Sequence, residues 1–340
     1  MQSPLDLLGR PLRDLRISVT DRCNLRCGYC MPREFFGRDF AFMEHDELLR
    51  FEELERVCRV FAQLGVRTVR LTGGEPLLRR NLEQLVAMIA AVPGIEDVAL
   101  TTNGTLLAAK AATLRDAGLR RVTVSLDALE PAAFRAMSDT HASLGRVLAG
   151  IDAAQSCGLQ PVKINMVVRR GVNDHCVLPM AEHFRGRPEI IRFIEYMDVG
   201  TTNGWRPADV VPTAELLAAI AGRWPLDPLP PDREGAVATR YRYRDGAGEI
   251  GFIHSISAPF CASCTRARLS AEGRLYTCLF ARTGHDVRAL LRGGATDDEL
   301  RTALVGIWTA RADRYSAERA ERIARRAPSP ERIEMSYIGG

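Results

Sequence analysis

Residues 15–32 read LRISVTDRCNLRCGYCMP, a short β-rich run that leads directly into a polar, arginine-rich loop. The run carries one cation, Arg16, and the loop carries three cysteines, Cys23, Cys27 and Cys30. Three thiols are an odd number for disulfides, and they are one short of the four ligands of a structural zinc site. The stretch therefore predicts a β-strand followed by a cysteine loop with unusual chemistry.

The pattern of a strand followed by a helix continues along the first two-thirds of the chain. The expected strands span residues 15–21, 66–74, 97–104, 120–128, 162–171 and 190–200. Between them, apolar residues recur at the three- and four-residue spacings of helices, and several of these stretches end at glycine. Repeated β/α units predict a parallel sheet, either an open doubly wound sheet or a barrel.

Four of the expected strands carry a cation where a buried parallel strand should be apolar: Arg16, Arg70, Lys163 and Arg192. A buried unpaired charge is very unfavourable, so these cations need either internal ion pairs or an anionic ligand. The inward side chains of a barrel converge on one cavity, so a barrel would gather the four cations. The strands therefore favour a barrel whose lumen binds a polyphosphate, with internal ion pairs as the alternative.

The character of the sequence changes after about residue 204. Residues 205–236 contain one expected helix and then a proline-rich connection that could serve as a linker. Expected hairpins follow around the turns DGAG (245–248) and AEGR (271–274). We expect two domains, a β/α domain at 1–225 and a C-terminal region at 226–340.

The composition indicates a globular protein of the cytoplasm. The chain has 340 residues and a formal net charge of +4, and it contains no apolar run near the roughly 18 residues that cross a membrane. Its first residues lack the pattern of a secretory leader. We therefore expect no membrane partner, and the mild charge gives no reason to expect nucleic acid. The arginine-rich residues 311–326 are interpreted as a solvated helix face.

Six of the nine cysteines fall in two triplets, since Cys261, Cys264 and Cys278 form a second group. In a reducing compartment, clustered cysteines indicate metal binding or catalysis and not disulfides. Thiolates favour iron–sulfur clusters, and a four-iron cluster normally takes four cysteines. Three thiolates would hold three irons and leave the fourth open to a substrate or cofactor. A structural zinc is the alternative, although each triplet is one ligand short of it.

The order CNLRCGYC (23–30) and then TGGEP (72–76) resembles the radical S-adenosylmethionine superfamily. The resemblance implies that Cys23, Cys27 and Cys30 hold a four-iron cluster whose open iron binds S-adenosylmethionine. It also implies that the reduced cluster cleaves this cofactor to a 5′-deoxyadenosyl radical, which takes hydrogen from the substrate. The positions that match cofactor contacts in the superfamily are Tyr29, Gly74, Ser125 and Met197, with Asn103 and Glu75 as further candidates.

The sequence is more closely similar to one family, the GTP 3′,8-cyclases of molybdenum cofactor biosynthesis. The similar segments are CASCTRARLSAEGRLYTCLF (261–280), VRLTGGEPLLRR (69–80), RFIEYM (192–197) and the terminal SYIGG (336–340). The implied fold is α/β, an incomplete (β/α)6 TIM-like barrel with a C-terminal α+β extension. The extension would carry a second four-iron cluster on Cys261, Cys264 and Cys278.

The same resemblance implies which residues contact GTP. They are Arg16, Arg70, Thr101, Lys163, Arg266, Ala267 and Arg268, and Arg192 is added because it belongs to the same set of strand cations. No side chain is assigned as catalytic, since the cofactor performs the chemistry, but the terminal Gly339 and Gly340 are expected to enter the active site and assist. Thr265 stands where the family usually has Asn, and we expect it to tune the site.

The implied reaction joins ribose carbon 3′ to guanine carbon 8 of GTP, the first step toward molybdopterin. The implied partners are GTP, an external flavodoxin- or ferredoxin-like electron donor and, downstream, cyclic pyranopterin monophosphate synthase, with a homodimer as the candidate assembly. Two alternatives stay open. One is a radical S-adenosylmethionine enzyme that modifies peptides and carries an auxiliary cluster, and the other is a zinc-stabilised nucleic-acid-binding module.

Overall fold

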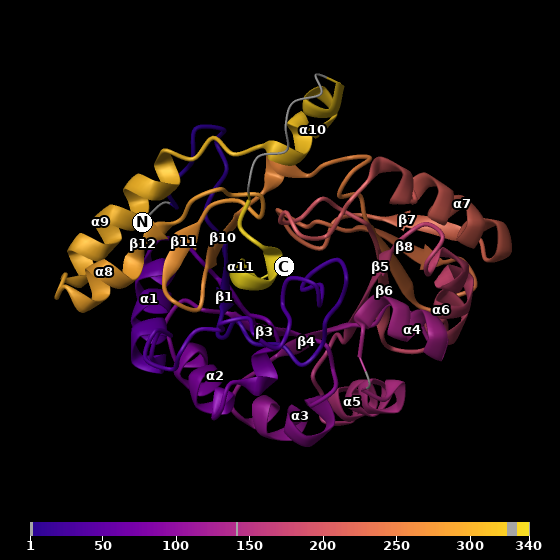
Figure 1. Cartoon of the computed structure of the whole chain (residues 1–340), viewed down its shortest axis with the longest axis horizontal. Helices are drawn as coiled ribbons and strands as arrows, with labels where there is room; N and C mark the ends of the chain where they lie inside the picture. The colour runs from indigo at the N-terminus through magenta and orange to yellow at the C-terminus, as the bar shows by residue number, and fades with distance from the viewer. Residues whose placement is uncertain (1–2, 141, 325–331, 340) are drawn as a thin grey trace.

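The chain folds around one continuous, curved β-sheet with helices along its outer face (Figure 1). The structure is a computed structural model, and it describes residues 3–140, 142–324 and 332–339. The sheet has twelve strands in the order β12-β11-β10-β1-β2-β3-β4-β5-β6-β9-β8-β7. Within the described chain the edge strands β12 and β7 do not pair with each other, so the barrel is incomplete.

Six consecutive parallel strands form the middle of the sheet. Each falls on one of the six expected strands, although the expected ranges run further into the following loops. The predicted incomplete β/α barrel is therefore confirmed. The six strands are β1 (Asp14–Ser18), β2 (Thr68–Thr72), β3 (Asp97–Thr102), β4 (Arg121–Ser125), β5 (Lys163–Val168) and β6 (Ile190–Glu195).

Amphipathic helices follow these strands and form the outer arc of Figure 1. In the first of them, Leu54, Val57, Cys58 and Phe61 are all buried, at the spacing that places side chains on one helix face. That face covers the sheet and closes the hydrophobic core. The helices are α1 (Phe51–Gln63), α2 (Leu82–Ala90), α3 (Leu107–Asp116), α4 (Pro131–Ser138), α5 (Leu144–Ser156), α6 (Val177–Phe184) and α7 (Thr213–Arg223).

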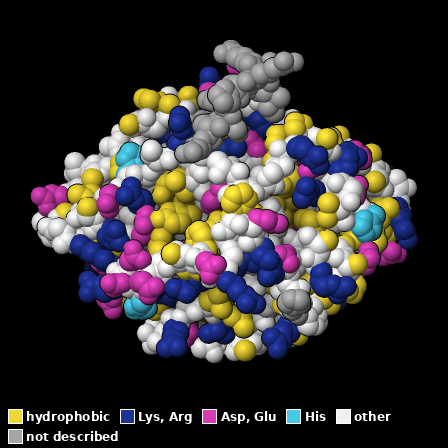
Figure 2. All heavy atoms as spheres, viewed as in Figure 1, with side chains coloured by type: hydrophobic (Ala, Val, Ile, Leu, Met, Phe, Trp, Pro, Cys, Tyr) yellow, Lys and Arg dark blue, Asp and Glu magenta, His cyan; other side chains and the backbone are white. Residues whose placement is uncertain are grey.

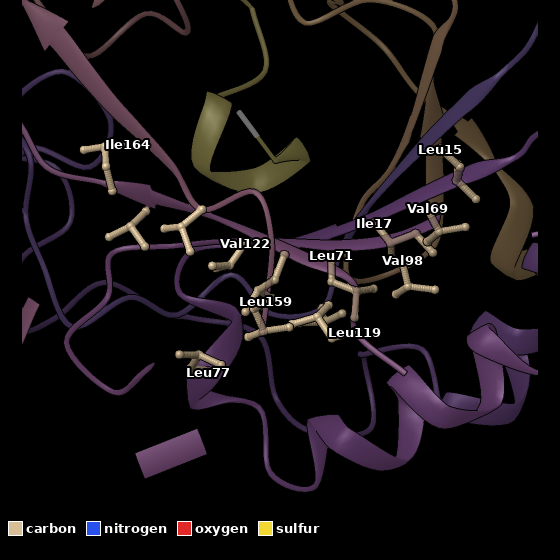
Figure 3. Packing of buried hydrophobic residues seen from close by; sticks show 14 of the residues in the cluster. Leu15, Ile17, Val69, Leu71, Leu77, Val98, Leu119, Val122, Leu159 and Ile164 are labelled. Carbon is tan, nitrogen blue, oxygen red and sulfur yellow. The ribbon is translucent and has the colours of Figure 1, made fainter. Parts of the chain in front are cut away.

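The alternation of side chains along the central strands separates an apolar core from a charged lumen. Leu15 and Ile17 on β1 are fully buried in the core, as are the strand residues around them in Figure 3. Successive strand residues point to opposite faces, so Arg16 points into the barrel. In the strand ladders Arg16 is the Cα partner of both Arg70 on β2 and Arg268 on β10. Three cations from three adjacent strands therefore share one level of the lumen.

The C-terminal region extends both edges of this sheet. It adds β9 (Glu249–Ile253), parallel to β6, at one edge and β10 (Arg266–Leu269), parallel to β1, at the other. The antiparallel strands β8 (Thr239–Tyr243), β11 (Arg274–Tyr276) and β12 (His285–Asp286) continue the sheet outward. Helices α8 (Val287–Arg292), α9 (Asp297–Thr309), α10 (Tyr315–Ala324) and α11 (Met335–Ile338) complete the chain.

One expectation for this region is corrected by the structure. Part of the proline-rich connection is not a linker, because Leu226–Leu229 forms the edge strand β7, antiparallel to β8. Pro228 is compatible with this place because an edge strand has N–H groups that need no partner in the sheet. The expected hairpins at 245–248 and 271–274 are confirmed as the β8–β9 and β10–β11 connections.

The face of the molecule shown in Figure 2 carries Lys and Arg side chains interspersed with Asp and Glu. The cations of the lumen are thus not part of a broad basic patch on that face. None of the described helices combines the length and the apolar composition that a membrane span requires.

Candidate active site

The first cysteine triplet lies in a loop beyond the carboxyl end of β1, the end at which barrel enzymes build their active sites. The backbone N–H groups of Cys30 and Met31 both donate to the carbonyl of Cys27, at 2.9 Å each, and this closes a tight turn. The Tyr29 hydroxyl donates to Asp127 Oδ2 at 2.9 Å. This contact ties the cysteine loop to the carboxyl end of β4.

The TGGE segment after β2 packs directly against the chain that enters this loop. The N–H of Gly74 donates to the carbonyl of Thr20, and the N–H of Glu75 donates to the carbonyl of Arg22, both at 2.8 Å. A Cβ on Gly74 would lie 2.3 Å from the Arg22 carbonyl oxygen, so only glycine permits this approach. Gly74 therefore has a packing role here, in addition to its predicted contact with the cofactor.

Glu75 is a buried carboxylate that joins the ends of β2 and β3. It accepts hydrogen bonds from Thr102 Oγ1 and from the Asn103 N–H, both at 2.7 Å, and from the Leu77 N–H at 3.0 Å. Burial raises the pKa of Glu75 to about 7, against the opposing effect of these donors. The Asn103 amide lies 3.9 Å from Cys23 Sγ. Asn103 thus faces the first triplet, and Glu75 holds it there.

The remaining predicted cofactor contacts lie at the same end of the barrel. Ser125 is the last residue of β4 and is the Cα partner of Asn165 on β5. Met197 follows β6 and lines the central cavity. The structure therefore gathers these positions with Tyr29 and Gly74 at the carboxyl ends of strands, and their contact with S-adenosylmethionine stays a prediction.

The second cysteine triplet lines that same central cavity. Cys261 begins the short helix η4 (Cys261–Ser263), Cys264 precedes β10, and Cys278 follows β11. Arg266 Nη2 and Arg311 Nη2 lie 3.4 Å and 3.2 Å from Cys264 Sγ. Burial acts to raise the pKa of Cys264, but the two arginines outweigh it and lower this pKa to about 6. The thiolate form, which binds metal, is stabilised at this position.

Neither triplet is arranged as a site for a single ion. Across the described residues, the one group with three potential ligand atoms all within 4.8 Å of one another is Glu130, His175 and Cys176. A tetrahedral zinc with Zn–S bonds of about 2.3 Å would hold its sulfurs about 3.8 Å apart. The three sulfurs of each cysteine triplet do not all lie within 4.8 Å of one another, and such a wider set of thiolates is compatible with a four-iron cluster.

One cavity collects most of the predicted substrate residues. Its empty volume, with the open mouth included, is about 1670 Å³. The predicted residues in its lining are Arg16, Arg70, Thr101, Lys163, Arg192, Arg266 and Arg268.

Arg16 and Arg70 lie side by side in the cavity without an anionic partner among the described residues. Arg70 Nη1 donates to Thr101 Oγ1 at 3.2 Å and to Thr123 Oγ1 at 3.3 Å. Arg16 makes no hydrogen bond or ion pair within the part of the chain that is described. Burial, together with repulsion from neighbouring arginines, lowers the pKa of both, that of Arg70 to about 9.

Lys163 and Arg192 complete the four strand cations. Arg192 Nε donates to the neutral Asn165 Oδ1 at 2.9 Å. Lys163 Nζ lies 3.7 Å from the Asp232 carboxylate, the one ion pair that these four cations form within the described chain. Burial, and then the charge of Arg192, lowers the pKa of Lys163 to about 8. Internal ion pairs therefore account for one cation of the four, and a polyanion would balance the others.

The segment from Arg266 to Arg268 is divided between two faces of β10. Arg266 and Arg268 line the cavity, and the Arg266 guanidinium also lies over the Phe260 ring, 5.1 Å from its centroid. Ala267 points the other way, is 1% exposed and belongs to the hydrophobic core. The predicted GTP contact of Ala267 would therefore have to come from its backbone.

Thr265, where the family usually has Asn, does not line the cavity in the described structure. It is 1% exposed, and its Oγ1 donates to Asp14 Oδ2 at 2.6 Å. Its carbonyl also accepts from the N–H groups of Arg13 and Asp14. Thr265 therefore fastens the start of β10 to the start of β1.

The C-terminal tail enters the barrel, as Figure 1 shows for α11. Gly339 has a φ of +72°, and its carbonyl accepts a hydrogen bond from Arg268 Nη1. A Cβ on Gly339 would lie 2.2 Å from Thr72 Cγ2, at the end of β2. The expected place of Gly339 next to the substrate residues agrees with these contacts, whereas Gly340 lies outside the described residues.

Two contacts anchor the tail before it enters the cavity. Arg332 Nη1 donates to Asp198 Oδ2 at 2.9 Å, and Asp198 Oδ1 also accepts from Arg319 Nε at 2.7 Å. Glu334 Oε1 accepts from the N–H of Thr201 at 2.8 Å. Both anchors bind the loop after β6, which also carries Met197.

The sequence did not identify several residues that shape this site. Asp198 stood within an expected strand end, and no local pattern marked Arg332 as its partner. Asp232 and Arg233, in the connection between β7 and β8, also line the cavity. These residues lie in loops, where polar side chains are common, so no spacing signal distinguishes them.

Comparisons with known proteins agree with this geometry. The profile of the Radical SAM superfamily matches residues 17–184, and that of Molybdenum Cofactor Synthesis C matches residues 190–317. The structure of Streptococcus suis SuiB bound to S-adenosylmethionine aligns with 86% of this chain and 67% of that chain, with a TM-score of 0.60 and 15% identity. This likeness supports the shared fold.

Curated relatives match along the whole chain. The GTP 3′,8-cyclase of Acidothermus cellulolyticus is 56% identical, with 100% of both chains covered. The GTP 3′,8-cyclase of Xanthomonas campestris pv. campestris is 54% identical over 98% of this chain and 97% of its own, and that of Staphylococcus aureus is 49% identical over 98% of each. The chain therefore belongs to the GTP 3′,8-cyclase family of the radical S-adenosylmethionine superfamily.

Proposed function

We infer that this chain is a GTP 3′,8-cyclase, which joins carbon 3′ of the ribose to carbon 8 of the guanine in molybdenum cofactor biosynthesis. The observation that carries this inference is the single cavity lined both by the second cysteine triplet and by strand cations, three of which lack an anionic partner among the described residues. A nucleoside triphosphate has a purine that can meet a cluster and a polyanion that can meet the cations.

The cofactors are two four-iron clusters and S-adenosylmethionine. We propose Cys23, Cys27 and Cys30 as ligands of the first cluster, and Cys261, Cys264 and Cys278 as ligands of the second. When bound, the first cluster and S-adenosylmethionine supply the radical chemistry that removes hydrogen from the substrate. The side chains of Tyr29, Ser125 and Met197, and the backbone at Gly74, would hold S-adenosylmethionine at the carboxyl ends of the strands.

The protein's own contribution is to orient GTP and to exclude water. We propose that the triphosphate lies among Arg16, Arg70, Lys163 and Arg192, with Thr101 as a neutral partner. Arg266 and Arg268, next to the second triplet, would bind nearer the purine. Fixing both ends of the nucleotide presents ribose carbon 3′ in one orientation, and such positioning is a large part of the barrier reduction in enzymes.

The domain division and the partners are also proposals. The boundary between 1–225 and 226–340 falls between α7 and β7, at the point where the chain begins to extend the edges of the barrel sheet. The reaction consumes electrons, so a flavodoxin- or ferredoxin-like donor would supply them, and cyclic pyranopterin monophosphate synthase would take the product. A homodimer is the proposed assembly.

Anaerobic reconstitution tests this function. We expect about eight irons per chain, as two four-iron clusters require, together with S-adenosylmethionine cleavage and a cyclised product that forms only with GTP. Arg268→Ala should abolish cyclisation and leave iron content and uncoupled cofactor cleavage largely intact. Cofactor cleavage without any consumption of GTP would contradict the assignment and would favour a peptide-modifying enzyme instead.

A further inference from the structure

The cavity extends through the barrel to the amino ends of the strands. The first residues of β1, β2, β4 and β5, which are Asp14, Thr68, Arg121 and Lys163, all belong to its lining. The second cysteine triplet lies at this same end, because Cys264 precedes β10, whose first residue Arg266 pairs with Asp14 at the start of β1. A nucleotide whose purine meets this triplet would therefore lie along the amino ends, with its phosphates directed toward Lys163 at the start of β5.

The connection between β7 and β8, residues 230–238, closes the cavity at the amino ends of the strands, the end that we call its floor. Asp232, Arg233 and residues 235–238 all contribute to the lining. The N–H of Ala236 donates to the carbonyl of Arg233 at 3.3 Å, so the connection turns just after the two charged residues. Two opposite charges, adjacent in the sequence, are thereby presented to the same part of the lumen.

Arg233 is anchored through one nitrogen only. Its Nη1 donates to Asp14 Oδ1 at 2.9 Å and to Thr68 Oγ1 at 3.2 Å. Its Nε and Nη2 make no hydrogen bond among the described residues, and the side chain is 43% exposed. Asp14 already receives a second donor from Thr265. The guanidinium therefore keeps free donors in the geometry that binds phosphate oxygens.

Asp232 places a negative charge in the same part of the lumen, where Arg233 places a positive one. Its carboxylate lies 3.7 Å from Lys163 Nζ and is 41% exposed. An anion at this position attracts the ammonium group that a phosphate would also need, and it repels the phosphate itself. Asp232 should therefore weaken the binding of a polyanion, whereas Arg233 should strengthen it.

We propose that Arg233 and Asp232 determine the specificity for the triphosphate, Arg233 by binding the terminal phosphate and Asp232 by competing with that phosphate for Lys163. This proposal rests on GTP being the substrate. Its consequence is that the two neighbouring residues act in opposite directions on the same quantity, the affinity for the third phosphate.

The test combines four variants of the reconstituted full-length protein: Arg233→Gln, Arg233→Lys, Asp232→Asn and, as a control, Arg244→Gln. Arg244 is exposed and pairs with Asp227, and neither residue lines the cavity. For each variant we would measure the KM and kcat for GTP and the inhibition constant of GDP, together with iron content. Asp232→Asn changes charge with almost no change in shape, so it keeps the proposal testable if Arg233→Gln misfolds.

Arg233→Gln should raise the KM for GTP by roughly tenfold, which is the change in affinity expected for the loss of one charge-assisted hydrogen bond. The kcat and the inhibition constant of GDP should change much less. Arg233→Lys should recover part of this loss. Asp232→Asn should lower the KM for GTP several-fold, which a merely damaged fold cannot do. Arg244→Gln should match the wild type.

Equal losses for GTP and GDP, or a change in kcat with an unchanged KM, would overturn the proposal and make Arg233 a structural residue of the floor. An unchanged or raised KM in Asp232→Asn would overturn the role of Asp232. These failures differ from failure of the proposed function, in which the wild type itself would not consume GTP.

Discussion

The carbonyl of Gly339 accepts a hydrogen bond from Arg268 Nη1, so the C-terminal tail contacts a cation of the central cavity. The same glycine lies against Thr72, which directly precedes the glycine-rich segment under the first cysteine loop. The tail therefore touches both halves of the site. Its anchors at Asp198 and Thr201 set how far it reaches.

Gly339→Ala should reduce the rate of cyclisation by more than about tenfold, because the added Cβ would overlap Thr72 and the left-handed backbone disfavours alanine. Product formation at saturating GTP is the measurement, with iron content as the check on folding. Gly246→Ala is the matched control, since Gly246 also has a positive φ but faces open space. Equal activity of the two variants would show that the tail position is unimportant.

Arg70→Met should weaken GTP binding and leave stability unchanged or slightly higher. Arg70 is repelled by Arg121 and Arg192 and has no anionic partner among the described residues, so the folded chain gains little from its charge. We expect the KM for GTP to rise by about tenfold or more while the melting temperature does not fall.

Arg121→Met is the comparison for this variant, because Arg121 lines the same cavity but is paired with Asp97. Removal of one partner leaves the Asp97 carboxylate without its cation, so this variant should melt at a lower temperature. If Arg70→Met melted as low as Arg121→Met, Arg70 would be a structural residue and not a substrate ligand.

The pH dependence of kcat/KM for GTP should report Lys163. Burial lowers its pKa to about 8, so the cation is lost as the pH rises through that value and phosphate binding weakens. Lys163→Arg keeps its charge over this range, and its profile should stay flat where that of the wild type falls. Identical profiles would exclude Lys163 as the titrating group.

The lowered pKa of Lys163 also affects stability, which should rise with pH where kcat/KM falls. The unfolded lysine has a pKa near 10.5, so between about 8 and 10.5 the unfolded chain binds more protons than the folded chain. The contribution of Lys163 to the free energy of unfolding should therefore rise with pH in this window. The difference in melting temperature between the wild type and Lys163→Met, followed from pH 7 to 10, would show it.

Glu75→Gln should destabilise the junction between β2 and β3 by about 1–3 kcal/mol. The two carboxylate oxygens of Glu75 accept hydrogen bonds from Thr102, Asn103 and Leu77, whereas an amide has only one oxygen that can accept. Thermal melting of the anaerobic protein is the measurement. Glu52→Gln, on the exposed face of α1, provides the control. A melting temperature equal to that of the control would mean that the junction does not depend on this carboxylate.

The class of fold and the two cysteine triplets could be predicted from the sequence alone. Both are local features of the sequence. Alternating strand and helix patterns predict the course of the backbone, and the spacing of the cysteines within each short segment predicts a metal cluster. The cations at Arg16 and Arg70 were also predictable, because a charge at an inward position of a parallel strand has few structural explanations.

How these parts complete one cavity could be seen only in the folded chain. Arg233 meets Asp14 from 219 residues away, Arg332 meets Asp198 from 134 residues away, and β10 joins β1 across most of the chain. No local periodicity encodes such pairs, because they form only when the curved sheet brings its edges and loops together. The triplets indicate the chemistry, and the long-range contacts assemble the cavity that we propose for the substrate.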